Sequence, residues 1–183
     1  MSETLLFFRQ LISRPLQVSA IAPSSRFLAK AMAKDLGPHT GRVVEFGPGT
    51  GRLTEGILNA GVRPENLTLF EMNPDFVTHL RARFPGVTVH LAGAQTAPAI
   101  VTKGVGAVVS GVPLLSMPMA LRKSIMAAAF EILSPEGVYI QFTYGPRPAL
   151  EEPELQSLGL TWKQTAYVPL NLPPARVHTF RRI

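Results

Sequence analysis

The feature that most constrains the fold is a regular alternation of short apolar segments with longer amphipathic ones. Strands are predicted for the apolar segments RVVEF (42–46), LTLFE (67–71), VTVHL (87–91), VGAVVS (105–110) and GVYIQFTY (137–144). Helices are predicted between them for RLTEGILNAG, NPDFVTHLRARF and PMALRKSIMAAAFEIL. The second of these has Asn73 as N-cap and Pro74 in its first turn. This alternation predicts an α/β fold with a mostly parallel sheet and helices on both of its faces.

The two ends of the chain depart from this alternation. LTWKQTAYV and ARVHTFRRI are two late strands without a helix between them, which predicts an antiparallel pair at the sheet edge. Near the start, Ser24 and Ser25 favour the beginning of a helix that runs through RFLAKAMAKDL to Gly37. Because 183 residues suffice for one full core, we expect an N-terminal helical segment at 1–36, binding membrane and acting as a lid, and one domain at 37–183.

The first residues, TLLFFRQLIS, predict a short amphipathic helix that ends at Pro15. Leu5, Phe8 and Leu11 fall on one side at helical spacing, and Arg9 lies on the other. Such a helix either docks on the core of its own domain or lies in the interface of a lipid bilayer, where bulky apolar side chains and arginines occur together.

Charge is concentrated towards the ends of the chain. The net charge is +6, residues 1–34 hold five basic side chains against the single acid Glu3, and no acid follows Glu154. Basic ends of this kind suit an anionic partner, either nucleic acid or a membrane surface, although a solvated face is the alternative.

Composition also excludes several classes of protein. The absence of cysteine excludes disulfides and thiolate metal sites, and the four histidines lack ligand spacing, so no metal is expected. No stretch reaches the roughly 20 apolar residues of a spanning helix. The first residues also lack the charge pattern and cleavage site of a signal peptide, so we expect a cytoplasmic protein.

The sequence VVEFGPGTGRL predicts a ligand-binding turn between a strand and a helix. Gly47, Gly49 and Gly51 allow close backbone approach, but Arg52 stands where the dinucleotide fingerprint requires its last glycine. S-adenosylmethionine has no phosphate and carries positive groups that Glu45 would favour. At the end of the next strand, Glu71 is placed to accept the hydroxyls of a ribose.

The pattern E-x-G-x-G-x-G followed by F-E resembles the class I S-adenosylmethionine-dependent methyltransferases, from about residue 40 to the end. The resemblance implies a Rossmann-like sheet of seven strands whose final hairpin is reversed, with S-adenosylmethionine as cofactor. A frequent Asp of the family is missing, so its adenine contact is expected from main chain or from Gln95. The cofactor-binding residues implied are Glu45, Gly47, Gly49, Thr50, Gly51, Glu71, Met72, Ala94, Gln95 and Ser110.

The uncharged loop SGVPLLS (110–116) follows the fourth predicted strand, where this class presents the transferred methyl group. Enzymes that methylate nucleic-acid bases place a side-chain amide and a stacking aromatic here. This chain keeps Pro113 but has Ser110 and Leu114 at those two positions. Loss of base stacking costs roughly 1 to 3 kcal/mol, so the loop favours a smaller amine than an extruded base.

Six segments together resemble the bacterial phospholipid N-methyltransferases, which convert phosphatidylethanolamine to phosphatidylcholine. The segments are PLQVSAIAPSSRFLAKAM, VVEFGPGTG, FEMNPDF, VVSGVPLLSMP, QFTYGP and NLPPARV. The resemblance implies methylation of phosphatidylethanolamine and its mono- and dimethyl derivatives at the inner face of the cell membrane, with the N-terminal helix as peripheral anchor. An enzyme like the rRNA adenine N6-dimethyltransferases, another small-molecule N-methyltransferase and a non-catalytic membrane-binding protein are the alternatives.

We expect Tyr144, Ser110 and the Gly111 carbonyl to hold the amine, with the Tyr144 ring facing the growing cation. An ordinary tyrosine at the end of a strand is the alternative for Tyr144. Arg176 is expected to bind the lipid phosphate. The further substrate-binding candidates are Ser24, Ser25, Arg26, Tyr144, Tyr167 and Asn171.

Overall fold

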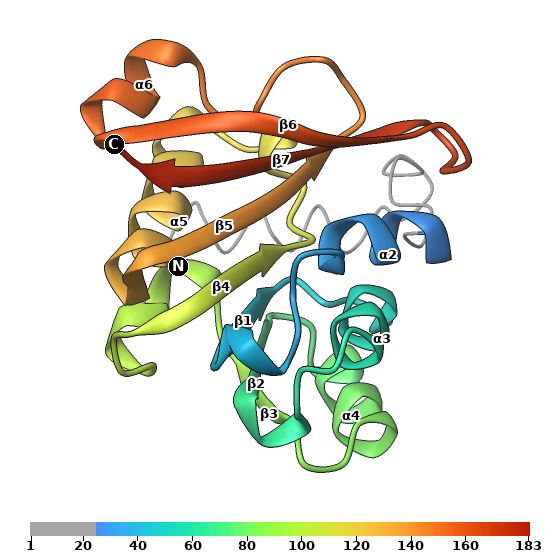
Figure 1. Cartoon of the computed structure of the whole chain (residues 1–183). Helices are drawn as coiled ribbons and strands as arrows, with labels where there is room; N and C mark the ends of the chain where they lie inside the picture. The colour runs from blue at the N-terminus through green and yellow to red at the C-terminus, as the bar shows by residue number, and fades with distance from the viewer. Residues whose placement is uncertain (1–24) are drawn as a thin grey trace.

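A computed structural model describes residues 25–183 of the chain (Figure 1). The helices are α2 (Arg26–Ala33), α3 (Arg52–Asn59), α4 (Pro74–Arg83), α5 (Met119–Ile132) and α6 (Glu152–Ser157). The strands are β1 (Val43–Phe46), β2 (Leu67–Glu71), β3 (Thr88–Leu91), β4 (Val105–Ser110), β5 (Leu133–Thr143), β6 (Leu160–Val168) and β7 (Ala175–Arg182). Short 3-10 turns cover Pro38–Thr40, Pro64–Asn66, Ala94–Ala99 and Leu114–Ser116.

The strands form one sheet of seven in the order β3-β2-β1-β4-β5-β7-β6. The first five strands in this order pair in parallel, whereas β7 runs antiparallel to both β5 and β6. The expected mostly parallel sheet with a reversed final hairpin is therefore confirmed. Since β1 lies between β2 and β4, the glycine turn after it and the loop after β4 leave the sheet side by side.

Helices cover both faces of the sheet, which gives two hydrophobic cores. One core contains α2, α3 and α4, and the other contains α5 and α6. All four residues of β1 are buried because successive side chains enter opposite cores, as Val43 and Val44 do. A central strand covered on both faces is therefore apolar throughout, and its one acid, Glu45, stands out as the exception.

Local capping explains where two of the predicted helices begin. The Ser25 hydroxyl accepts the Leu28 N–H at 3.2 Å and caps α2. The Asn73 side chain accepts the Asp75 N–H at 2.8 Å, and Pro74 occupies the first turn of α4. Both predicted caps are confirmed.

Helix α2 belongs to the same core as the sheet. Leu28 and Met32 are buried in it, and α2 crosses α3 so closely that a Cβ added to Gly56 would lie 2.9 Å from that of Ala29. The predicted boundary after residue 36 therefore separates two segments that share one core. The membrane-binding and lid roles expected for residues 1–36 stay predictions. The amphipathic helix expected near the start lies outside the described residues. Within residues 25–183, no helix has the length and apolarity needed to cross a membrane.

Candidate functional site

The glycine turn after β1 and the loop after β4 lie in direct contact. The Gly47 N–H donates to the Phe70 carbonyl at 2.9 Å, and the Gly111 N–H donates to the Phe46 carbonyl at 2.8 Å. A Cβ added to Gly111 would lie 2.6 Å from the Gly47 carbonyl oxygen, so any larger residue would push the two loops apart. The fold therefore brings together the two motifs that the sequence places some sixty residues apart.

Glu71 joins this crevice from the end of β2. Its Oε2 accepts the Gly49 N–H at 3.1 Å, and its Oε1 accepts the N–H groups of Met72 at 2.8 Å and Asn73 at 2.9 Å. A half-buried carboxylate that binds three backbone donors is held in a fixed orientation. Glu71 of the predicted set thus contacts the glycine turn, Met72 binds Glu71 through its backbone N–H, and their part in cofactor binding stays a prediction.

Glu45 is fully buried next to the turn. Its Oε2 accepts the Thr54 hydroxyl at 2.7 Å, but its Oε1 has no hydrogen-bond partner among residues 25–183. Burial raises the pKa of Glu45 to about 8, while the Thr54 hydrogen bond opposes the shift and the charge of Glu71 adds to it. A positive ligand group beside Glu45 would favour its ionised form and use the free oxygen.

The other predicted cofactor residues border the same edge of the sheet. Ala94 is buried, and the Gln95 Oε1 is buried without a partner in the described part of the chain, so it offers an acceptor to a ligand N–H. The Thr50 carbonyl accepts the Arg83 guanidinium at 2.7 Å, which ties the exposed turn to α4. Gly51 ends the turn and caps α3.

Ser110 is fully buried at the end of β4, and its hydroxyl accepts the Val112 N–H at 3.3 Å. Gln141, its neighbour on β5, donates to the Val112 carbonyl at 3.0 Å and accepts the Tyr139 hydroxyl at 2.8 Å. Sequence reasoning missed Gln141, although a lone amide in the apolar strand GVYIQFTY was the available signal. Gln141 and Ser110 together fix the shape of the loop at 110–113.

Tyr144 follows β5 and is half-buried, with its ring edge-on to Phe142 at 5.4 Å. Burial raises the pKa of Tyr144, and the neighbouring Asn171 side chain opposes the shift. Tyr144 packs with the core that contains α2, whereas the Ser110 hydroxyl lies near Tyr139, which belongs to the other core. The two side chains therefore pack beside different cores, and their joint hold on an amine stays a prediction.

The β6–β7 hairpin carries three of the predicted substrate residues, Tyr167, Asn171 and Arg176, and contacts the start of α2 through Asn171. Asn171 is buried, accepts the Ser25 N–H at 3.0 Å and donates to the Pro173 carbonyl at 2.7 Å. The Arg176 guanidinium lies over the Tyr167 ring, 5.0 Å from its centre. Arg176 also pairs with Thr143 in the sheet, so it lies beside the end of β5.

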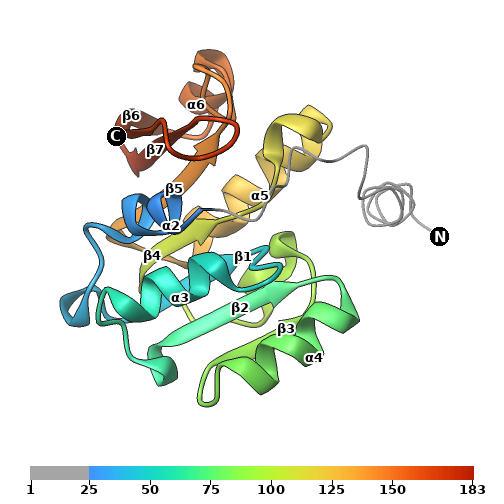
Figure 2. The same cartoon turned by 90° about the vertical axis from the view of Figure 1, so that its right-hand side faces the viewer.

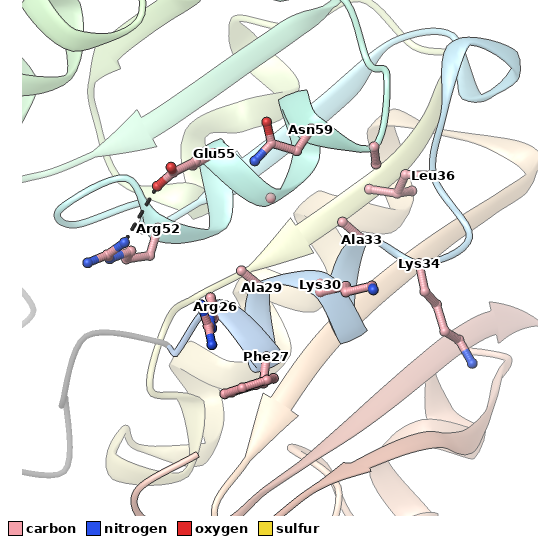
Figure 3. A pocket seen from close by; sticks show the side chains of 12 residues that line it. Arg26, Phe27, Ala29, Lys30, Ala33, Lys34, Leu36, Arg52, Glu55 and Asn59 are labelled. Atoms are coloured by element: carbon pink, nitrogen blue, oxygen red, sulfur yellow. Dashed lines mark ion pairs between the residues drawn. The ribbon is translucent and has the colours of Figure 1, made fainter. Parts of the chain in front are cut away.

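A groove of about 750 Å³ is lined by residues of α2 and α3 (Figure 3). Arg26, Phe27 and Lys30 line it from α2, and Arg52 and Glu55 line it from α3. Arg26 lies over the Phe27 ring, 5.0 Å from its centre. Ser24 lies outside the described residues. No cluster of three or more acidic or histidine side chains suited to a metal occurs in residues 25–183.

Comparisons with known proteins place this geometry in context. No protein-family model matches the chain. The chain is 27% identical to the ornithine lipid N-methyltransferase of Singulisphaera acidiphila over an alignment of 199 residues, which covers 100% of this chain and 98% of that one.

Two solved structures share the fold. The 1,6-didemethyltoxoflavin-N1-methyltransferase of Burkholderia thailandensis, solved with its substrate and S-adenosylhomocysteine, has a TM-score of 0.70, with 17% identity and 98% and 88% of the two chains covered. A TehB-like S-adenosylmethionine-dependent methyltransferase of Corynebacterium glutamicum has a TM-score of 0.67, with 13% identity and 96% and 97% covered. The sequence relationship spans the full length of a lipid N-methyltransferase, and the molecule has the fold of the class I S-adenosylmethionine-dependent methyltransferases.

Proposed function

We propose that the protein is an S-adenosylmethionine-dependent N-methyltransferase whose acceptor is the amine of a membrane lipid. The observation that carries the proposal is the crevice at the ends of β1 and β2, where Glu45 keeps a buried oxygen free and Glu71 is fixed by three backbone donors. Full-length similarity to a lipid N-methyltransferase supports the choice of acceptor.

The residues of the crevice fit the proposed cofactor. S-adenosylmethionine, when bound, supplies a methyl group on a positively charged sulfur. Glu45 favours the positive groups of this ligand, Glu71 accepts from its ribose, and the free Gln95 Oε1 accepts from the adenine amino group. Gly49 leaves open space over the turn, since a Cβ built there would meet nothing within 4 Å.

The chain must align the acceptor nitrogen and let it attack as a neutral amine. Alignment and exclusion of water supply much of the acceleration in such a displacement. An ethanolamine ammonium has a pKa near that of lysine, roughly 10, so it must first release one proton to solvent water. A carbonyl or hydroxyl oxygen that accepts a remaining N–H of the neutral amine then orients its lone pair towards the methyl group. We assign the Gly111 carbonyl and Tyr144 to this role, with the Ser110 hydroxyl and Gln141 fixing the loop that carries Gly111.

Phosphatidylethanolamine and its mono- and dimethyl derivatives are the acceptors we favour, so that the product is phosphatidylcholine. Arg176 binds the headgroup phosphate in this proposal, with Ser25, Arg26, Tyr167 and Asn171 around it. An ornithine lipid is the second candidate, because it is the acceptor named for the full-length relative and also carries an amine. In either case the enzyme acts at the inner face of the cell membrane, with the N-terminal helix as a peripheral anchor.

The test offers one labelled cofactor to competing acceptors. Purified full-length protein is incubated with methyl-labelled S-adenosylmethionine and vesicles that contain phosphatidylethanolamine, vesicles that contain an ornithine lipid, or ribosomal RNA. Label in an amine lipid supports the proposal, and its distribution between the two lipids decides the acceptor. Label in RNA alone would overturn the proposal, and so would binding to vesicles without any transfer of the methyl group.

A further inference from the structure

Two leucines stand exposed at the tip of the β6–β7 hairpin. Leu170 is 68% and Leu172 82% exposed, and the three prolines of the tip, Pro169, Pro173 and Pro174, are exposed as well. Single apolar side chains on a surface are ordinary, but an uninterrupted apolar tip is a feature of interaction surfaces. The candidate site makes no use of either leucine.

The tip is held in this form by the residue between the leucines. The Asn171 side chain is buried, with one hydrogen bond to the Ser25 N–H and one to the Pro173 carbonyl. It turns inward and leaves its two neighbours facing outward. The same contact fixes the tip to the start of α2, so the hairpin tip and that helix form one surface.

Helix α2 contributes charge and a further apolar group to this surface. Arg26, Phe27 and Lys30 are exposed on α2, and Figure 3 shows the two basic side chains beside the groove. No acid occurs from residue 155 to residue 183 or from residue 26 to residue 34. We call Arg26, Phe27, Lys30, Leu170 and Leu172 the tip surface, which is apolar at its summit and positively charged beside it.

The tip surface faces the same way as the candidate site. In Figure 1 the strands β4 and β5 point towards α2, and the hairpin tip projects in the same direction. Figure 2, viewed from that side, shows α2 and the hairpin loop next to the edge where β4 ends. A partner on the tip surface would therefore lie beside the crevice that holds Glu45 and Glu71.

We propose that the tip surface docks on an anionic lipid bilayer, with Leu170 and Leu172 entering the boundary between headgroups and acyl chains. Arg26 and Lys30 contact lipid phosphates there, since basic side chains beside an apolar summit match an anionic membrane surface. A protruding tip also suits a deformable bilayer better than a protein, which would need a complementary hollow. The inference rests on the proposed function, because docking turns the same site towards its lipid substrate.

The first test measures insertion at single sites. The chain has no cysteine, so Leu172→Cys and Ile183→Cys can each carry one environment-sensitive fluorophore. Ile183 is the matched control: it is 86% exposed and lies at the other end of the hairpin. On vesicles of phosphatidylcholine and phosphatidylglycerol, the label at 172 should shift to the blue and be quenched by lipid-borne quenchers, while the label at 183 stays unchanged. Equal spectra at the two sites would overturn the proposal.

The second test measures affinity for the same vesicles by sedimentation. L170S/L172S should reduce partition into anionic vesicles at least fivefold, whereas I183S should stay within twofold of the parent protein. Equal partition of the double variant and the parent would overturn the proposal. Methyl transfer to detergent-dispersed amine lipid separates the two hypotheses. Insertion without any methyl transfer contradicts the proposed function and leaves the docking surface standing. Methyl transfer without insertion at residue 172 supports the proposed function and contradicts the docking of the tip surface.

Discussion

The Glu71 carboxylate accepts the Gly49 N–H at 3.1 Å and so joins the end of β2 to the turn that follows β1. This contact, with those to the N–H groups of Met72 and Asn73, holds the carboxylate in one orientation beside the glycine turn. A fixed carboxylate and a fixed turn reduce the ordering that binding requires.

Gly49→Ala should lower the affinity for S-adenosylmethionine at least tenfold. Gly49 has φ of +54° and open space at its Cβ position, so the added methyl group would occupy room that the cofactor needs. Gly41→Ala is the control, because Gly41 has φ of +71°, also faces open space and precedes β1 at its other end. Both variants should lose roughly 1 to 3 kcal/mol of unfolding free energy, because an L-residue is strained at positive φ. Titration calorimetry should find weaker binding only in Gly49→Ala, and equal affinities would show that the turn does not bind the cofactor.

Glu45 should make the free protein less stable as the pH rises from 5 to 8. The pKa of Glu45 is about 8 in the folded protein, above its ordinary value of 4.5. Between these two pH values the unfolded chain has released the proton, whereas the folded protein still holds it. The stability that Glu45 contributes is present below pH 4.5 and is lost towards pH 8, by about 2 to 4 kcal/mol. Chemical denaturation at several pH values measures this loss.

Glu45→Gln provides the comparison for that pH dependence. The variant should show a flatter fall in unfolding free energy between pH 5 and pH 8, and it should bind S-adenosylmethionine more weakly because the amide carries no negative charge. Excess cofactor should also flatten the fall in the parent protein, since a positive ligand favours ionised Glu45. Identical pH slopes in parent and variant would contradict this account of Glu45.

Arg176→Ala should weaken the use of lipid about tenfold and leave the affinity for S-adenosylmethionine nearly unchanged. The guanidinium lies over the Tyr167 ring on the hairpin, and β4 and β5 stand between its strand β7 and the crevice strand β1. A lone guanidinium there suits a headgroup phosphate. Arg181→Ala removes an arginine from the far end of the same strand and should leave both properties unchanged. Kinetics against lipid concentration and calorimetry with the cofactor separate the two effects. Equal loss of both in Arg176→Ala would assign this arginine a structural role.

Two substitutions separate the role of the Tyr144 hydroxyl from that of its ring. Tyr144→Phe should lower kcat several-fold if the hydroxyl binds the amine, and Tyr144→Ala should lower it further because the ring beside Phe142 is lost as well. Thermal unfolding of both variants checks that the fold survives. Full activity in Tyr144→Ala would place this residue outside the site.

The order of strands and helices was predictable because each element carries its own local signal. Apolar runs mark the buried strands, and the caps Ser25 and Asn73 mark two helix starts. The contacts that shape the site were not predictable, because they join residues far apart in the chain. Asn171 reaches Ser25 across 146 positions, and Gln141 reaches Val112 across 29. Such contacts depend on which strands become neighbours, and no local pattern encodes that choice.

The burial of Ser110 illustrates the same limit. Its place at the end of β4 was predicted from the sequence, but the direction of its hydroxyl follows from the pleat of the strand and from the Val112 N–H that it accepts. Glu45 is the converse case. Its position in the middle of a strand that is buried on both faces is enough to indicate a buried carboxyl group, and the structure adds the Thr54 hydroxyl as its partner.

The most direct test of the central claim is the mass spectrum of the lipid after incubation with S-adenosylmethionine that carries a deuterated methyl group. The full-length protein is mixed with vesicles that contain phosphatidylethanolamine, an ornithine lipid and phosphatidylglycerol, and Gly49→Ala serves as the cofactor-deficient control. The account predicts headgroup fragments in which the nitrogen bears deuterated methyl groups, formed at least tenfold more slowly by the variant. Deuterated methyl found on an oxygen, or lipid left unmethylated by a protein that binds the cofactor, would contradict it.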